Sequence, residues 1–359
     1  MNTLRVKTGW LRVLTFRKCW NAFLVYLSYV ISLFLKKAVV WGSPVSISVE
    51  PTNRCNLHCP ECELGSGRLR RQKGNISLDL FKKLVDENRN ILVWMNLCFQ
   101  GEPYLHPQLP AMISYASRAG IYTMVATNGH FLNGHSAMET VKSGLGLLLV
   151  SVDGTDQATY EKYRRGGNLS RVLGGVREVV RVKKALNAGH PDVVIQFLVT
   201  SVNEHQVDDI RRLGNELGAD DVWVKTAQVG LSENPVSWIP RQECYSRYTY
   251  EDRQLKLKNR FRNRCLRIWT TAVVMWDGNL VPCCFDKDAA YRMGDVAKNG
   301  LRTCWKQKDF MDFRARVLKG RSGINMCRNC TEGLKLTKKN RHFPAAGGRM
   351  EVRERVRWS

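Results

Sequence analysis

Three cysteines on one short loop constrain this chain more than any other feature. Cys55, Cys59 and Cys62 follow directly on the β-branched run at residues 45–49, with the spacing C-x3-C-x2-C. Three thiolates on such a loop can hold three corners of a [4Fe–4S] cube, and the fourth iron then has no protein ligand from the loop. Zinc is the alternative, but a structural zinc site needs four closed ligands, and we expect His58 to point away from the cysteines. The spacing therefore favours iron–sulfur over zinc.

Downstream of this loop, short apolar runs alternate with helical segments, which is typical of repeated βα units around a parallel sheet. The predicted strands are residues 45–49, 93–99, 121–126, 147–152, 193–199 and 221–226. The predicted helices are residues 78–87, 110–118, 136–142, 173–186 and 204–217. These units are fewer than a closed barrel needs. We therefore expect an α/β fold built on a partial (β/α)6 barrel, with the carboxyl ends of its strands around one mouth.

Polar motifs follow three of these strands. They are Gln100-Gly101-Glu102-Pro103, Thr127-Asn128-Gly129 and Ser151-Val152-Asp153-Gly154. Each contains a glycine, which allows a tight turn or a close approach of the backbone to a ligand, although any one of them alone could be an ordinary turn. Because the three motifs follow successive strands after the cysteine loop, we predict a single site at the mouth.

A second set of cysteines lies in the C-terminal third of the chain. An Asp-Gly pair at residues 277–278 separates two β-rich runs and predicts a hairpin. Cys265 and Cys283 flank this hairpin, so its folding can bring the two thiols together. Cys327 and Cys330 add a C-x2-C pair further on. Four cysteines in two pairs can close either a zinc site or a second cube, and the spacing leaves both open.

The N-terminal segment is a basic leader around the apolar run 22–35. This run is too short to span a bilayer. It predicts a helix that either packs on the main domain or lies at an anionic lipid surface. No small-residue cleavage site follows the run, so we expect reduced thiols and a cytoplasmic protein, peripheral at the membrane if residues 1–42 bind lipid.

The net charge of +24 is compatible with a nucleic acid, an anionic membrane or an acidic substrate as partner. No interleaved aromatic and basic pattern marks a face for single-stranded nucleic acid, so we expect no nucleic-acid partner. A zinc-bearing nucleic-acid-binding protein is the alternative from a non-enzyme class. That alternative accounts for the cysteines and the charge, but it leaves the βα alternation and the motif at residues 101–103 unexplained.

Residues 44–333 resemble a radical S-adenosylmethionine (SAM) enzyme with a SPASM- or twitch-type C-terminal extension. The cysteine loop is the defining motif of that family, and the later motifs follow in the expected order. Composition and this resemblance together predict five segments: an N-terminal helix (1–42), the partial barrel (43–228), a charged linker or substrate-facing insert (229–264), an auxiliary-cluster domain (265–333) and a basic tail (334–359). It also implies that SAM chelates the open iron of the [4Fe–4S] cluster on Cys55, Cys59 and Cys62.

The resemblance further implies which residues hold SAM. Glu102 stands in a motif that departs by one residue from the commoner Gly-Gly-Glu-Pro, and its carboxylate would accept from the SAM ammonium. Ser151 matches a serine that contacts SAM after the fourth strand. Arg164 matches an arginine that pairs with the SAM carboxylate, the alternative being a surface charge beside Arg165. Three residues at strand ends could reach the nucleoside: Asn128, Gln196 and Lys225.

For the second cysteine set, the resemblance implies one auxiliary [4Fe–4S] cluster of the twitch type. No cysteine follows Cys330, whereas a full SPASM region would continue with more. The implied ligands are Cys265, Cys283, Cys327 and Cys330. Cys284 could replace Cys283, and Cys304 is a weaker competitor. The remaining thiols are predicted to be structural: Cys19, Cys98 and Cys244.

The activity implied is that of a radical SAM oxidoreductase or maturase. Reductive cleavage of SAM gives methionine and a 5′-deoxyadenosyl radical, which removes hydrogen from an unactivated C–H bond. A low-potential donor such as flavodoxin or ferredoxin would supply the electron. We expect a peptide or protein substrate. The alternatives are dehydrogenation of a carbohydrate or other small-molecule alcohol and, more remotely, a cyclic-nucleotide rearrangement for molybdopterin synthesis.

Overall fold

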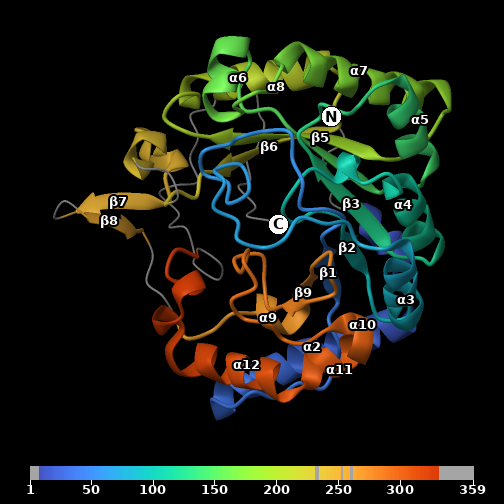
Figure 1. Ribbon diagram of the computed structural model, residues 1–359, viewed down its shortest axis with the longest axis vertical. Helices are drawn as coiled ribbons and strands as arrows, with labels where there is room; N and C mark the ends of the chain where they lie inside the picture. The colour runs from blue at the N-terminus through green and yellow to red at the C-terminus, as the bar shows by residue number, and fades with distance from the viewer. Residues whose placement is uncertain (1–7, 231–233, 252–253, 259–261, 331–359) are drawn as a thin grey trace.

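Six parallel strands form the centre of the fold and join the sheet in sequence order. The computed structural model describes residues 8–230, 234–251, 254–258 and 262–330 (Figure 1). In this part of the chain, one sheet has the order β10-β9-β1-β2-β3-β4-β5-β6, and β1 to β6 pair in parallel with their neighbours. The sheet is curved and carries helices on its outer side (Figure 1). The predicted partial (β/α)6 barrel is confirmed.

The elements of the barrel lie within a few residues of their predicted bounds. The strands are β1 (Ser46–Val49), β2 (Trp94–Asn96), β3 (Tyr122–Thr127), β4 (Leu147–Ser151), β5 (Asp192–Val199) and β6 (Asp221–Thr226). The predicted helices are α3 (Leu78–Asn88), α4 (Leu109–Arg118), α5 (Gly134–Lys142), α7 (Leu169–Ala185) and α8 (Val207–Glu216). The sequence pattern did not predict α6 (Gln157–Tyr163), a short helix capped by the Asp156 carboxylate, which accepts from Thr159 N.

The N-terminal segment closes the amino end of the barrel. Alternate residues near the starts of the strands form a buried inner cluster: Tyr122, Met124, Leu147, Leu149 and Val194. From the 3-10 helix η1 (Gly9–Val13), Trp10 and Val13 pack against this cluster. Because these side chains fill the amino end of the barrel, the carboxyl end is the one left for a site.

The hairpin predicted at residues 277–278 is confirmed, and it extends the barrel sheet. β9 (Thr271–Val274) pairs in parallel with β1, and β10 (Leu280–Val281) pairs antiparallel with β9. Every residue of these two strands is buried. The C-terminal helices are α9 (Arg267–Thr270), α10 (Val296–Asn299), α11 (Leu301–Lys306) and α12 (Lys308–Gly320). The C-terminal region is therefore joined to the barrel by strand pairing.

The segment 229–264 contains regular structure that the sequence pattern did not predict. The 3-10 helices η4 (Pro235–Trp238) and η5 (Glu243–Tyr245) precede an antiparallel pair, β7 (Tyr248–Glu251) and β8 (Gln254–Leu257). This pair projects away from the barrel (Figure 1). The predicted basic tail, 334–359, lies outside the described residues.

The apolar run near the N-terminus forms a longer helix than its hydrophobic residues alone indicate. α2 (Phe16–Leu35) has 20 residues and is capped by Thr15, whose side chain accepts from Lys18 N. In the described part of the chain it is the one helix that meets the length and composition of a membrane span. Of the 18-residue stretch of α2 that meets these criteria, 28% is buried inside the protein. Cys19, predicted to be a structural thiol, is exposed on this helix, so that prediction is wrong for Cys19.

Candidate active site

The cysteine loop begins at the carboxyl end of β1, on the side of the barrel mouth. Cys59 is buried, and Cys55 and Cys62 are half-buried. Leu57 N donates to Cys55 Sγ at 3.4 Å, and Arg164 Nη1 lies 3.9 Å from Cys59 Sγ. Burial raises the pKa of Cys55 and raises the pKa of Cys59 to about 11. Thiols of this kind lose their protons when a metal binds, so the donor set fits an iron–sulfur cluster.

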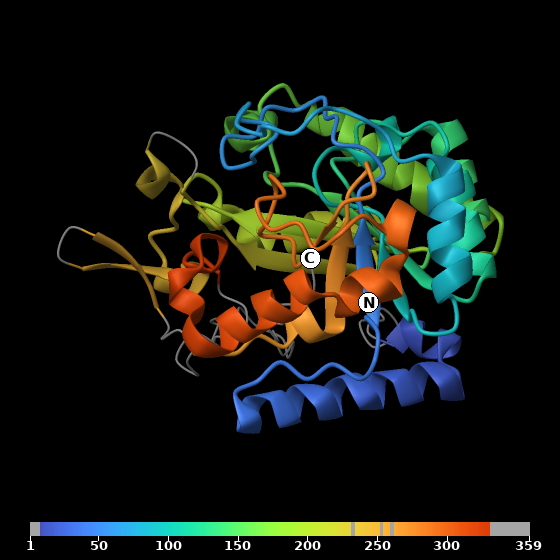
Figure 2. The ribbon, with the colours of Figure 1, turned by 60° about the horizontal axis from the view of Figure 1, so that its bottom comes forward.

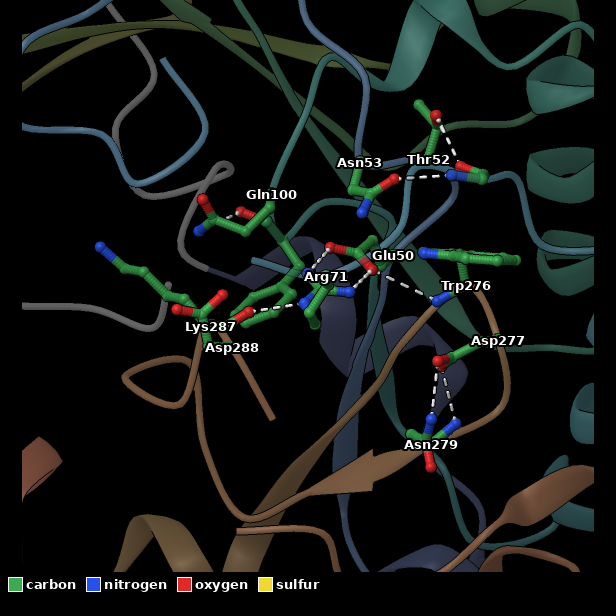
Figure 3. A network of polar contacts seen from close by, with 12 residues as sticks. Glu50, Thr52, Asn53, Arg71, Gln100, Trp276, Asp277, Asn279, Lys287 and Asp288 are labelled. Atoms are coloured by element: carbon green, nitrogen blue, oxygen red, sulfur yellow. Dashed lines mark hydrogen bonds and ion pairs between the residues drawn. The ribbon is translucent and has the colours of Figure 1, made fainter. Parts of the chain in front are cut away.

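A buried ion pair between Glu50 and Arg71 links the segment that follows the cysteine loop to the C-terminal region (Figure 3). Glu50, directly after β1, accepts two hydrogen bonds from the Arg71 guanidinium at 2.7 and 2.8 Å. Arg71 Nε donates to the Lys287 carbonyl at 2.7 Å, and Trp276 N donates to Glu50 Oε2 at 3.3 Å. Burial raises the pKa of Glu50, while Arg71 opposes that shift. The bidentate pair thus joins three distant segments of the chain.

The motif at residues 100–103 packs its backbone on the cysteine loop. Glu102 N donates to the Arg54 carbonyl at 2.7 Å. Gly101 has a φ of +89°, and a Cβ atom there would lie 2.4 Å from the Thr52 carbonyl oxygen. Glycine is therefore needed both for the left-handed backbone and for the close approach.

The variant Gly101→Ala should bind less iron, because its new methyl group would collide with backbone atoms of the cysteine loop. The measurement is iron per chain after anaerobic reconstitution. Gly120→Ala is the matched control, since Gly120 also has a left-handed φ, +77°, but no atom of the described chain lies within 4 Å of its Cβ position. Equal iron in the two variants would show that the collision does not displace the cysteines.

Glu102 is buried and organises the carboxyl end of β3. Its carboxylate accepts from Thr127 Oγ1 at 2.6 Å, from Asn128 N at 2.7 Å and from Tyr104 N at 3.1 Å. Burial raises the pKa of Glu102, and these hydrogen bonds offset only part of that rise. Because a carboxylate offers about four lone-pair positions, these bonds leave room for a further donor.

Asn128 connects the end of β3 to the cysteine loop. Its Nδ2 donates to Asn56 Oδ1 at 2.8 Å and lies 3.8 Å from Cys55 Sγ. Asn128 Oδ1 lies 3.0 Å from His130 Nδ1, and His130 Nε2 accepts from Asn168 N at 2.8 Å. Because Nε2 accepts, neutral His130 carries its proton on Nδ1 and donates it to Asn128. Burial lowers the pKa of His130, which favours this neutral form.

Arg164 is mostly buried beside Cys59, so the alternative that it is a surface charge is wrong. It follows α6, its side chain is 15% exposed, and its Nε donates at 2.5 Å to the fully buried Asp153. The other oxygen of Asp153 accepts from Leu198 N at 2.7 Å. Burial acts to lower the pKa of Arg164, but Asp153 and Cys59 outweigh it and hold that pKa well above its usual value. The guanidinium therefore stays charged beside the cysteine loop.

The variant Asp153→Asn should destabilise the fold by about 3 kcal/mol, because it leaves the charge of Arg164 without its buried partner. The measurement is the thermal midpoint of the anaerobically purified protein. Asp208→Asn is the control, since its ion pair with Arg211 lies on the exposed side of α8 and should contribute less than about 1 kcal/mol. An Asp153→Asn midpoint no lower than that of the control would contradict the assigned role of the buried pair.

The other candidates for SAM contact lie on β4, β5 and β6. Ser151 ends β4 and pairs with Gln196 of β5 across the sheet. Lys225, near the end of β6, has Cys98 and Cys284 as nearby acidic groups, and burial lowers its pKa to about 8. Ser151 and Gln196 are therefore neighbours, whereas Lys225 lies toward the C-terminal region.

Four cysteines of the C-terminal region are buried: Cys265, Cys283, Cys327 and Cys330. Burial raises the pKa of Cys283 well above its usual value, and the nearby Cys284, Cys265 and Cys330 add to the shift. Arg321 Nη2 donates to Cys330 Sγ at 3.2 Å. Burial acts to lower the pKa of Arg321, but Cys265, Cys330 and Cys327 raise it overall. Three of these thiols, those of Cys265, Cys327 and Cys330, are electrostatic neighbours of the Arg321 guanidinium, which suits an anionic iron–sulfur cluster with a cationic neighbour.

The competing cysteines lie in other surroundings. Cys284 Sγ accepts from Arg267 Nη1 at 3.3 Å and packs in a separate cluster with Phe99. Cys304 is buried in α11, where Asp295 is its charged neighbour. In the pair that follows the hairpin, Cys283 has Cys284, Cys265 and Cys330 as electrostatic neighbours.

Comparisons with known families agree with this geometry. Residues 49–214 match the family model of the radical SAM superfamily, and residues 265–331 match that of the SPASM iron–sulfur cluster-binding domain. The chain is a radical SAM enzyme with a SPASM domain. The second match decides between zinc and iron–sulfur, which the cysteine spacing left open.

Individual relatives cover different shares of this radical SAM enzyme. The tungsten-containing aldehyde ferredoxin oxidoreductase cofactor-modifying protein of Pyrococcus furiosus is 23% identical over 299 residues, 74% of this chain and 82% of the relative. A PqqA peptide cyclase of Bradyrhizobium diazoefficiens is 26% identical over 195 residues, 53% of this chain and 48% of the relative.

Among solved structures, the fold is similar to that of Streptococcus suis SuiB. With SAM bound, SuiB gives a TM-score of 0.60 at 14% identity, over 80% of this chain and 71% of SuiB. With the precursor peptide SuiA bound, it gives a TM-score of 0.58 at 14% identity, over 79% of this chain and 69% of SuiB. At this identity the likeness shows the fold alone.

Sequence reasoning missed several residues that position the site. Asp153 belongs to a motif that the sequence analysis singled out, but its partner, Arg164, is visible only once α6 is placed. His130 follows directly on the Thr127–Gly129 motif, and that adjacency is the signal that could have found it. Arg71 and Arg321 lie in basic stretches without any local pattern.

Proposed function

We propose that this enzyme cleaves SAM reductively at the barrel mouth and uses the resulting radical to modify a peptide or protein. The observation that supports this most is the convergence on the cysteine loop of Glu102 after β2, Asn128 after β3 and Arg164 after α6. A carboxylate and a guanidinium beside an open-cornered cluster suit the ammonium and the carboxylate of an amino acid.

In this proposal Cys55, Cys59 and Cys62 hold the cluster, which when bound and reduced supplies the electron that splits SAM into methionine and a 5′-deoxyadenosyl radical. Glu102 accepts from the SAM ammonium. Arg164, oriented by Asp153, binds the SAM carboxylate. The candidates for the nucleoside and its surroundings remain Ser151, Asn128, Gln196 and Lys225.

We propose one auxiliary [4Fe–4S] cluster on the four C-terminal cysteines. Four protein ligands leave no iron open for substrate, so this site suits electron transfer. After hydrogen abstraction, the substrate radical would give up an electron here, and the net result would be a two-electron oxidation or a cross-link. Flavodoxin or ferredoxin is the proposed donor of the first electron.

The position of the insert 229–264 supports the proposal of a peptide-sized substrate, because the insert contacts the cysteine loop and so lies beside the site. Gly230 N donates to Glu61 Oε2 at 2.9 Å, and the rings of Trp238 and Tyr163 meet edge to face at 5.4 Å. A groove of about 770 Å³ runs along the insert, lined by residues such as Ser201, Pro240, Tyr248 and Lys258. The names of two similar proteins, a peptide cyclase and a structure with a precursor peptide, point to the same substrate class.

Anaerobic reconstitution followed by a SAM-cleavage assay tests this function. We expect iron and acid-labile sulfide in the protein, and 5′-deoxyadenosine after reduction with SAM. Peptides encoded nearby in the genome should raise its formation and change in mass. Stimulation by a carbohydrate or another small-molecule alcohol instead would favour the small-molecule alternative. A colourless, zinc-containing preparation without acid-labile sulfide would overturn the proposal.

A further inference from the structure

Helix α2 buries several of its polar side chains against the protein and exposes many of its large apolar ones, although Val25 is also buried. Lys18, Asn21, Ser28 and Ser32 are buried. Large apolar side chains on the opposite side are exposed, and we call them the α2 stripe: Phe16, Trp20, Phe23, Tyr26, Val30 and Phe34. Their spacing of three or four residues puts them on one face of the helix. Phe16 and Phe34, at its two ends, are 84% and 82% exposed.

Hydrogen bonds hold the helix in this orientation. Lys18 Nζ donates to the Gly120 carbonyl at 2.6 Å. The Asn21 side chain donates to the Ser43 carbonyl at 3.0 Å and accepts from Ser43 N at 2.9 Å. Ser32 Oγ accepts from Val39 N at 2.9 Å. Turning the α2 stripe inward would break these buried bonds, and crossing a bilayer would move Lys18 and Asn21 into hydrocarbon.

The chain around the stripe carries only positive charge. Residues 1–49 contain seven Lys and Arg residues and no Asp or Glu. Arg17, Lys36 and Lys37 are exposed at the two ends of α2. A second copy of α2 laid on the stripe would bring these cations together without an acidic partner, whereas anionic lipid headgroups complement them. Charge therefore favours a lipid surface over self-association.

We propose that α2 docks the enzyme on an anionic membrane surface, with the helix lying in the plane of the interface and the stripe inserted among the lipids. Figure 2 shows α2 along the outer edge of the molecule, with no other described segment beyond it. Gly120 and Ser43, which anchor α2, precede β3 and β1. The docked helix thus lies at the amino end of the barrel, and the mouth with the cysteine loop opens away from the membrane.

Co-sedimentation of the reconstituted full chain with lipid vesicles tests this proposal. The vesicles contain either phosphatidylcholine alone or phosphatidylcholine and phosphatidylglycerol in equal parts. We expect binding to the anionic vesicles that weakens with salt, and weaker binding to the neutral ones. The variant Trp20→Ser/Phe23→Ser/Phe34→Ser should bind about a thousandfold more weakly, because each of the three inserted rings contributes roughly a tenfold factor.

Controls separate this proposal from folding defects and from other occupants of the stripe. Leu186→Ser/Val236→Ser removes apolar side chains that are 42% and 46% exposed elsewhere, and it should bind like wild type. SAM cleavage by the stripe variant should also be unchanged. Absence of vesicle binding by wild type, or equal binding by the stripe variant, would overturn the proposal. So would a wild-type dimer that the stripe variant converts to a monomer, because a second copy would then cover the stripe.

Discussion

Replacing Cys59 with alanine should remove about half of the bound iron and abolish SAM cleavage, because a cube with two protein ligands is not retained on the loop. Cys59 is the most buried of the three loop thiols, at 7% exposure. It is also the one that Arg164 approaches. Loss of the cluster therefore removes both the electron source and the iron that SAM chelates. The measurements are iron and acid-labile sulfide per chain, and 5′-deoxyadenosine formed under reducing conditions.

Cys304→Ala is the control for this experiment. Cys304 is equally a buried thiol, but it lies in α11 beside Asp295. The control variant should keep its full iron content and its SAM cleavage. A Cys59→Ala protein with the iron content of the control would contradict the assignment of the loop cysteines. Iron lost from both variants would instead indicate that any buried thiol change unfolds the protein.

The features that sequence predicted correctly are local ones. Strands and helices of the barrel repeat with short periods, so the runs at residues 121–126 and 147–152 are visible without any partner. The hairpin follows from an Asp-Gly pair between two β-rich runs. The order of these elements along the chain was then enough to predict an open barrel with one mouth.

The features that sequence did not predict depend on contacts across the fold. Arg71 reaches Glu50 only because the cysteine loop turns back over the end of β1. The hairpin was expected in a separate small domain, but β9 pairs with β1, more than two hundred residues earlier in the chain. No periodicity within either segment specifies such a pairing.

Helix α2 shows a different limit of sequence reasoning. Its apolar periodicity is plain, and the usual rule places the apolar face of a helix against the protein. Here Lys18, Asn21 and Ser32 have hydrogen-bond partners in the fold, so the face that carries them is buried, together with Val25. A pattern identifies the two faces of a helix, but only the partners decide which face turns inward.

The variant Cys283→Ala should lose the auxiliary cluster and product formation while it keeps SAM cleavage. Cys283 is buried with Cys284, Cys265 and Cys330 as neighbouring thiols, whereas the proposed cluster at the barrel mouth has three other cysteines as its ligands. We therefore expect about half of the iron, continued formation of 5′-deoxyadenosine, and no modified peptide. The measurements are iron content, 5′-deoxyadenosine and peptide mass on the same preparation.

The adjacent residue supplies the matched control, because Cys284→Ala removes a thiol one position away in the chain. Cys284 faces Arg267 at 3.3 Å, so this variant should keep all of its iron and form product. The opposite result, iron lost from Cys284→Ala and kept in Cys283→Ala, would assign the ligand to Cys284. Loss of SAM cleavage from Cys283→Ala would show that the auxiliary cluster supports the barrel mouth structurally. Retained SAM cleavage without product would instead place the auxiliary cluster after hydrogen abstraction, where it can accept the substrate electron.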